Sequence, residues 1–306
     1  MKKKPIKDLA ASVHQRLLDK ARKAGRPFNE LLQYFAIERF LYRLSQSKHS
    51  KNFVLKGALM LNVWEESSLP RPTLDIDLLC KGASNHVDSV VLVIREVCGS
   101  RVVSDGIAFD PNTVQGTRIA EDAGYEGVRV RFSGLLGRAR LSMQLDVGFG
   151  DVVIPSEEAI QYPAILDFPS PLLRGYSKES TVAEKFEAGV RLGDLNSRMK
   201  DFFDIWYLSR QFSFEGSTLA TAIMETFSRR GTVLSPEVAP LNAAFGEDAK
   251  KAAQWRAFRK RSHLETAPES FEELMNAVAA FLKPVAVEIS TRGRFDGRWN
   301  ATGPWS

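Results

Sequence analysis

Residues 101–149 alternate apolar and polar side chains with a period of two, whereas the segments before and after them repeat apolar residues at helical spacing. The alternating segments are short and are punctuated by Gly and Asn, as antiparallel strands joined by tight turns are. We find no strand–helix–strand repeat of the dinucleotide-binding kind. The chain is therefore expected to be an α+β protein with a small sheet flanked by helices and a helical C-terminal half.

Helical patterns at both ends of the chain suggest how it is divided. Two amphipathic or apolar segments, 7–25 and 28–47, predict N-terminal helices, and nearly everything from residue 180 onward is helical in pattern. Prolines between 155 and 171 mark a connector. We expect one part over 1–170, with the sheet, and a mostly helical part over 171–306 that contributes to the same site. The aromatic tail is either docked or loose.

The composition excludes several classes of protein. Hydrophobic residues make up 44% and charged residues 26% of the 306 residues, which is ordinary for a soluble globular protein. No apolar run approaches the ~20 residues of a membrane span, and no hydrophobic stretch follows the basic start, so we expect a cytoplasmic protein without membrane contact. Two cysteines exclude a disulfide framework, and the absence of CxxC and HExxH argues against zinc.

The segment "RPTLDIDLL" places Asp75 and Asp77 in an apolar stretch that should be a strand. If Leu74, Ile76 and Leu78 face the core, the two aspartates project together from the other face, about 7 Å apart. Aspartate is disfavoured in strands, and like charges ~4 Å apart cost about 4 kcal/mol at an effective dielectric of 20. We therefore expect a metal site, with oxygen ligands that suit Mg²⁺ or Mn²⁺. The alternative is an edge strand with two solvated carboxylates.

Two further segments fit a site for a phosphate-bearing ligand. In "FVLKGALML" a strand ends at Lys56 and Gly57 and a helix begins, so backbone N–H groups and a lysine could hold phosphate. In "RLSMQLDVGFG" Asp146 alternates with apolar residues, which makes it a third metal ligand or a general base. Alone, each could be an ordinary turn residue.

The helical half contains charges where burial is expected. "NSRMKDFFDIWYL" is apolar almost all round, yet Lys200, Asp201 and Asp204 share one sector, and Lys185 lies one helix earlier. Buried charges are costly unless they are paired or functional, so these residues form either an internal salt-bridge cluster or a set that holds a triphosphate. The basic segment from Lys250 to Arg261 suits an RNA partner or is an ordinary solvated helix face.

These segments, in this order, resemble the AbiEii/AbiGii family of toxins with a nucleotidyltransferase fold. The resemblance rests on "FVLKGALMLNVW", "RPTLDIDLL", "LDVGFGD", "TVAEKFEAGVRLG" and "NSRMKDFFDIWYL", and it extends over nearly the whole chain. It implies a small mixed sheet with a helical C-terminal half. It also implies an NTP substrate, a divalent metal, transfer of a nucleotide to an acceptor such as a tRNA 3′ end, and a cognate antitoxin.

The resemblance assigns roles to individual residues. Carried over, Gly57 would hold phosphate, Asp75 and Asp77 would bind the metal, and Lys185 would contact the triphosphate. Asp201 or Asp204, with Lys200, would complete the last motif. Nucleotidyltransferases commonly have a hydroxyl residue in the phosphate turn, where this chain has Ala58. Its absence removes one phosphate hydrogen bond, worth ~1–2 kcal/mol.

Three other readings of the same residues stay open. The acceptor could be a protein rather than tRNA. The chain could be a nucleotide- or RNA-binding protein that has little or no catalytic activity, in line with Ala58. A phosphatase with an aspartyl nucleophile also uses a DxD motif, but Pro70 and Pro72 interrupt the apolar strand that such enzymes have before it.

Overall fold

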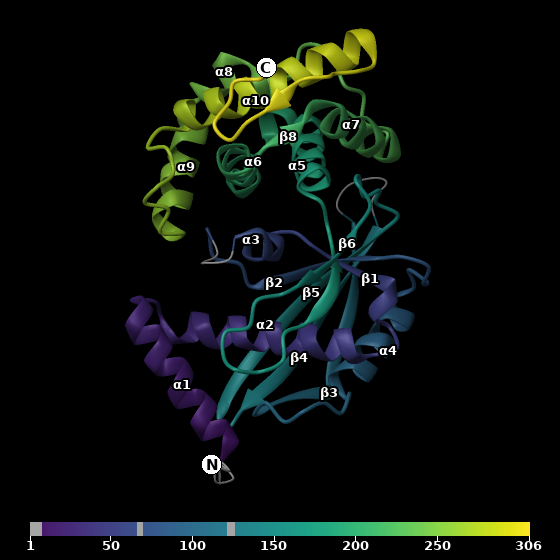
Figure 1. Ribbon diagram of the computed structural model, residues 1–306, viewed down its shortest axis with the longest axis vertical. Coiled ribbons are helices and arrows are strands. Elements are labelled where there is room, and N and C mark those ends of the chain that lie inside the picture. The colour runs from purple at the N-terminus through teal and green to yellow at the C-terminus, as the bar shows by residue number, and fades with distance from the viewer. Residues whose placement is uncertain (1–7, 66–69, 121–125) are drawn as a thin grey trace. The chain divides into compact units, whose positions relative to one another are not determined.

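The computed structural model describes residues 8–65, 70–120 and 126–306, and its chain forms two compact units (Figure 1). We call Met1–Leu69, Thr73–Gly150 and Glu158–Gly175 the sheet unit, and Pro70–Pro72, Asp151–Glu157 and Tyr176–Ser306 the helical unit. Two short segments of the predicted first part thus belong to the helical unit, and residues up to Gly175 belong to the sheet unit.

The sheet unit contains a seven-stranded mixed sheet in the order β3-β4-β5-β2-β1-β7-β6. β2 is parallel to β5 and antiparallel to β1, which is parallel to β7. The antiparallel meander predicted for residues 101–149 is confirmed as β3–β4–β5, although its first strand begins only at Ile107. The strands are β1 Phe53–Lys56, β2 Asp75–Cys80, β3 Ile107–Ala120, β4 Glu126–Leu136, β5 Ala139–Phe149, β6 Glu158–Gln161 and β7 Leu172–Gly175.

The strands β6 and β7 were not predicted. They lie in the proline-rich segment that the sequence marks as a connector, and each has four residues. Such short strands give little periodicity, and β6 is an edge strand with three of its four residues exposed. β7 joins the sheet by pairing with β1, more than a hundred residues earlier in the chain, and local patterns do not encode such a contact.

One face of the sheet carries the core of this unit. α2 (Phe28–Gln46) and α4 (Val87–Cys98) cover it, and α1 (Leu9–Ala24), which ends at the left-handed Gly25 as expected, packs on α2 (Figure 1). Ile76 and Leu78 are buried on this face. Leu74, expected to join them, is 58% exposed because β2 begins one residue later, so that part of the prediction is wrong.

The helical unit is built around a long central helix. α10 packs against α6, α7, α8 and α9, and α5 packs between α6 and α7. The helical pattern predicted from residue 180 onward is confirmed by six helices in the described part of this unit. The helices are α5 Lys178–Leu192, α6 Met199–Gln211, α7 Gly216–Arg230, α8 Ala243–Gly246, α9 Ala249–Arg261 and α10 Phe271–Arg292; in the sheet unit, α3 is Leu59–Trp64.

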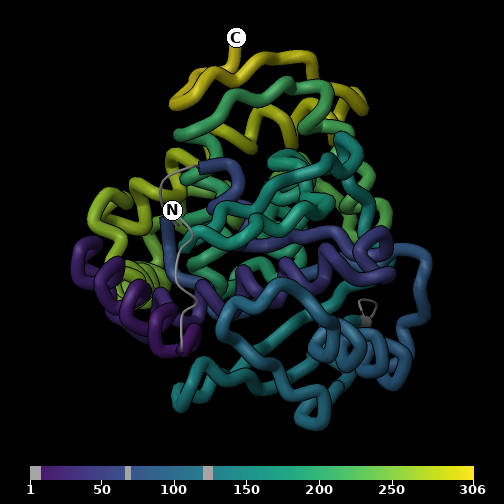
Figure 2. The backbone as a smooth tube through the Cα atoms, turned by 60° about the horizontal axis from the view of Figure 1, so that its bottom comes forward, coloured from purple at the N-terminus to yellow at the C-terminus, as the bar shows by residue number. Residues whose placement is uncertain are grey.

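The C-terminal segment is docked rather than loose (Figure 2). Its strand β9 (Arg298–Trp299) pairs with β8 (Phe214–Glu215), which precedes α7. Trp305 stacks on Phe281 of α10 with 5.6 Å between ring centroids, and its indole Nε1 donates to the Phe281 carbonyl at 2.8 Å. The tail therefore completes the apolar packing of α10.

α10 is also the one helix in the described part of the chain that is long and apolar enough to cross a membrane by length and composition. Its buried residues include Leu274, Val278, Phe281 and Val285. They form the centre of the helical unit, which accounts for the apolar composition of this helix without a membrane.

Candidate functional site

Asp77 lies at the centre of a row of polar residues that crosses the sheet. It is in register with Lys56 of β1 on one side and with Asp146 of β5 on the other, and the row continues to Arg129 of β4 and Thr117 of β3. Residues in register on neighbouring strands point to the same face of a sheet. The row therefore lies on the face opposite to Ile76 and Leu78, which is not the face covered by α2 and α4.

A second polar row lies two residues along the same strands. Arg131 Nε donates to Gln144 Oε1 at 3.1 Å, and Gln144 Nε2 donates to Asp75 Oδ1 at 2.9 Å. Asp75 and Asp77 both remain partly exposed, while Ile76 between them is buried. The expected alternation, with two aspartates projecting from one face, is thus present in the structure.

Asp146 is held by an arginine from the neighbouring strand. Arg129 donates from Nε to Oδ1 at 2.8 Å and from Nη2 to Oδ2 at 2.7 Å, so both carboxylate oxygens are engaged. A bidentate arginine holds the carboxylate in a fixed orientation. The pair places a guanidinium beside the aspartate row, and the role of Asp146 as a general base stays a prediction.

Gly57 is required by the position of Asp77. β1 ends at Lys56, Gly57 has a left-handed φ of +72°, and α3 begins two residues later, as predicted. A Cβ atom on Gly57 would lie 2.1 Å from Asp77 Oδ2. Only glycine therefore allows the Asp77 carboxylate to approach the backbone of this turn, which links the phosphate-turn motif to the aspartate motif in space.

The aspartates suit a divalent cation by their chemistry. Asp75 and Asp77 offer carboxylate oxygens from alternate positions of one strand, which is the ligand type that Mg²⁺ and Mn²⁺ prefer. In the described part of the chain, however, no group of three or more His, Cys, Asp or Glu side chains is arranged to hold a metal ion. The pair fits a cation that takes its remaining ligands from water and substrate, and metal binding by Asp146 stays a prediction.

The helical unit buries the second set of candidate residues as one ion-pair network. Lys185 Nζ lies 3.0 Å from Asp201 Oδ1 and 2.6 Å from Asp204 Oδ2. Arg71 donates two bonds to Asp204, at 2.6 and 2.7 Å, and Arg198 Nε lies 2.6 Å from Asp201 Oδ2. An ammonium has three N–H donors, so Lys185 keeps one beyond those that face the aspartates.

The pairing in this network outweighs the cost of burial. Burial raises the pKa of Asp201, but Lys185, Arg198 and Lys200 attract the carboxylate more strongly and bring its pKa down to about 2. The pKa of Asp204 is likewise lowered by Arg71 and Lys185 against the effect of burial. Burial lowers and the two aspartates raise the pKa of Lys185, with a net rise. All members are therefore charged at neutral pH.

Lys200 was expected to lie in one sector with Asp201 and Asp204, but it is not a member of this network. Its side chain is exposed, and it acts on Asp201 only through the electrostatic attraction described above. The cation in contact with Asp201, besides Lys185, is Arg198. Lys200 therefore does not share the buried sector of the two aspartates, and its part in the last motif stays a prediction.

The basic segment Lys250 to Arg261 is also only partly a solvated surface. Lys251 is buried, with Nζ donating to the carbonyls of Asp194 and Asn196 at 2.7 and 3.0 Å. Trp255 and Phe258 are buried too. These three residues hold α9 in place, which leaves the remaining basic residues of the helix as candidates for a nucleic-acid contact.

Arg71 and Arg198 were missed by the sequence reasoning. Arg71 was noted only for its flanking prolines, which interrupt the strand pattern, and yet it is 7% exposed and bonded to a carboxylate 133 positions away. The available signal was its charge in a Pro-Arg-Pro segment just before Asp75. Arg198 gave no signal beyond its place at the start of α6.

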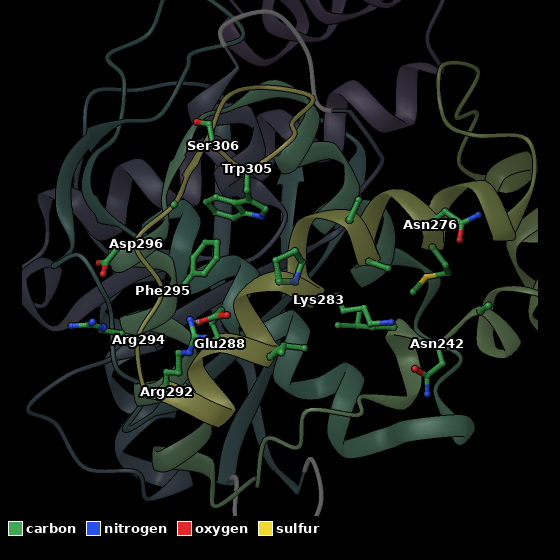
Figure 3. Close-up of a pocket in the computed structure, with 18 of the residues that line it drawn as sticks. Asn242, Asn276, Lys283, Glu288, Arg292, Arg294, Phe295, Asp296, Trp305 and Ser306 are labelled. Carbon is green, nitrogen blue, oxygen red and sulfur yellow. Dashed lines mark hydrogen bonds and ion pairs between the residues drawn. The ribbon is translucent and has the colours of Figure 1, made fainter.

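A cavity of about 1030 Å³ lies elsewhere in the helical unit (Figure 3). It runs between α10, α8 and the C-terminal segment, with Phe295 and Trp305 on one side and Lys283 along the helix. None of the ion-pair network residues lines it. We therefore do not include this cavity in the candidate site.

The chain was compared with known proteins. Two solved structures from Helicobacter pylori are similar: one described as a candidate nucleotidyltransferase (16% identity, 87% of this chain and 98% of that chain, TM-score 0.49) and JHP933 (15%, 87% and 93%, TM-score 0.48). No curated protein matches. The family model described as "Nucleotidyl transferase AbiEii toxin, Type IV TA system" matches residues 39–277, a span that includes the aspartate rows, the Gly57 turn and the ion-pair network. The chain therefore belongs to the AbiEii family of nucleotidyl transferase toxins of type IV toxin–antitoxin systems.

Proposed function

We propose that this nucleotidyl transferase toxin uses a divalent cation, Mg²⁺ or Mn²⁺, to transfer a nucleotide from an NTP to an acceptor hydroxyl at a tRNA 3′ end. The observation that carries the proposal is the position of Asp77. It adjoins Gly57, lies between Lys56 and Asp146 in the sheet, and is two residues from Asp75. One small surface thus combines metal-type ligands with a turn and a lysine suited to phosphate.

The residues of the sheet unit receive separate roles in this proposal. Asp75 and Asp77 hold the cation, which when bound polarises the α-phosphate and neutralises charge on the leaving group. Lys56 and the backbone at Gly57 hold phosphate oxygens. Asp146 orients Arg129 toward the same face, and the guanidinium supplies a fixed positive charge for a phosphate.

The residues of the helical unit are assigned to the triphosphate. Lys185 contacts it through the N–H that does not face Asp201 or Asp204, and these two aspartates keep the ammonium charged and fixed in direction. Lys200, which is exposed and lies outside the buried network, keeps its predicted role as a phosphate contact, and the phosphate belongs either to the triphosphate or to the acceptor.

The reaction itself needs little covalent chemistry from the protein. The acceptor oxygen forms a bond to the α-phosphorus, the bond from this phosphorus to the bridging oxygen of the β-phosphate breaks, and pyrophosphate leaves. The hydroxyl proton passes to solvent or to a nearby carboxylate. Positioning and charge stabilisation therefore account for most of the catalysis, as in other phosphoryl transfers.

The test is transfer of label from each of the four α-labelled NTPs to total tRNA in the presence of Mg²⁺. The parent protein should label tRNA, and D75N and D77N should lose activity by at least about a hundredfold, since both would bind the cation. D88N is the matched control, because Asp88 is an exposed aspartate of the same unit on α4. Label on the protein instead would identify a protein acceptor. Nucleotide binding without turnover would identify a non-catalytic binder.

Family membership also implies a cognate antitoxin. We propose that the toxin acts in the cytoplasm, where NTPs and tRNA are found, and without membrane contact. Localisation of a tagged protein checks this directly, since enrichment in a membrane fraction would contradict it.

A further inference from the structure

The first turn of α6 and one face of α9 enclose a second cavity of about 380 Å³ in the helical unit. Three of its lining residues carry positive charge, Arg198, Lys200 and Arg261, and no acidic residue of the described part of the chain lines it. Its remaining lining residues are Ser197, Met199, Gln254, Ala257 and Phe258. A concave surface with one sign of charge concentrates ligands of the opposite sign.

The cations around this cavity are arranged rather than scattered. Arg198 is fixed through Nε to the buried Asp201, which also contacts Lys185. Lys200 is exposed, and Arg261 comes from the last turn of another helix, also exposed. α6 begins here without a side-chain cap, so its N-terminal dipole adds to the positive potential. The cavity therefore shares Arg198 with the ion-pair network, and its other cations lie outside that network.

We propose that this cavity binds a backbone phosphate of the RNA acceptor. The inference rests on the proposed function, because it concerns the acceptor of that reaction. Arginine and lysine supply the charge-assisted hydrogen bonds that phosphate oxygens accept, and Gln254 adds a neutral donor.

A polymer of phosphates fits this surface better than a single nucleotide does. Lys250 lies one turn before Gln254 on the same side of α9, and eleven residues of helix separate it from Arg261, a distance of about 16 Å. Both ends of this line are exposed cations, so phosphates of one strand can bind at each end. Trp255 is fully buried behind the line and cannot stack on bases, so the contact reads the backbone and not the sequence.

The experiment measures RNA binding without NTP, by fluorescence anisotropy of a labelled single-stranded oligonucleotide at several salt concentrations. Removing one cation that contacts a phosphate of a single strand lowers the slope of log affinity against log salt concentration by about 0.7. At 0.1 M salt this corresponds to an affinity about fivefold lower. We expect R261Q to bind the oligonucleotide about fivefold more weakly than the parent protein, and R261Q/K200Q about 25-fold more weakly. R256Q is the matched control, because Arg256 is an exposed arginine of the same helix about 140° away from Arg261.

Two results would overturn the inference. Equal effects of R261Q and R256Q would mean that α9 attracts RNA by its charge alone and that the cavity has no special role. A loss of ATP affinity in R261Q, with RNA affinity unchanged, would assign the cavity to the nucleotide. Neither result depends on turnover, whereas the proposed function fails only if the parent protein transfers no label to RNA.

Discussion

The pair of Arg71 and Asp204 offers the sharpest test of the buried network. Arg71 donates two hydrogen bonds to Asp204, both groups are almost completely buried, and Lys185 contacts the same carboxylate. Replacing Arg71 by Met removes one cation but leaves Asp204 its bond to Lys185. Replacing Asp204 by Asn instead leaves three cations, Arg71, Lys185 and Arg198, facing the single carboxylate of Asp201.

The two substitutions should therefore differ in a defined order. Removing one partner of a buried ion pair costs about 3–5 kcal/mol. The loss in free energy of unfolding should lie near the lower value for R71M, because two cations still face two aspartates. It should lie near the upper value for D204N, because positive charge is left unbalanced. At roughly 3 °C per kcal/mol for a unit of this size, the expected falls in melting temperature are about 9 °C and about 15 °C.

Tryptophan fluorescence makes this measurement specific to the helical unit, which contains four of the five tryptophans: Trp206, Trp255, Trp299 and Trp305. The double variant should cost less than the sum of the single variants, by 0.5–3 kcal/mol, because Arg71 and Asp204 interact directly. A larger loss in R71M than in D204N, or strict additivity, would refute the description of these residues as one coupled ion-pair network.

Three further predictions concern Gly57, Glu38 and Asp201. G57A should reduce kcat/KM at least about a hundredfold, because the added Cβ would overlap Asp77 Oδ2 and because alanine in this left-handed backbone costs ~1–2 kcal/mol. A fully active variant in the labelling assay would exclude a role for this turn. Burial raises the pKa of Glu38 to about 7, above its unfolded value near 4. The free energy of unfolding of the sheet unit should therefore fall by on the order of 3 kcal/mol as the pH rises from 4 to 7. Urea titrations of E38Q should not show this dependence on pH. The pKa of Asp201 is lowered to about 2, so its stabilisation is complete above pH 4 and is lost as the pH falls from 4 to 2, a loss that acid titration of D201N should not show.

Much of this structure could be predicted because local patterns and burial agree. The helices from 9–24 to 271–292 follow apolar periodicity, and Asp75 and Asp77 share a face because a strand alternates its side chains. The placement of Asp146 beside Asp77 could not be derived, since it depends on β2 pairing with β5, about seventy residues later. That Arg198 rather than Lys200 meets Asp201 follows from helix geometry, because residues three apart lie on one face and adjacent residues do not.

The ion pairing of the buried network indicates why such an arrangement would be kept. Arg71, Lys185 and Arg198 contact Asp201 and Asp204, and each of the two aspartates meets two of these cations. For stability alone, buried ions gain little over apolar packing of the same volume. A lysine whose ammonium is held by two aspartates is instead suited to contact an anionic ligand. On this argument a bound triphosphate should stabilise the helical unit, and K185M should abolish that stabilisation while the free protein remains folded, because Asp204 keeps its two bonds to Arg71 and Asp201 keeps Arg198.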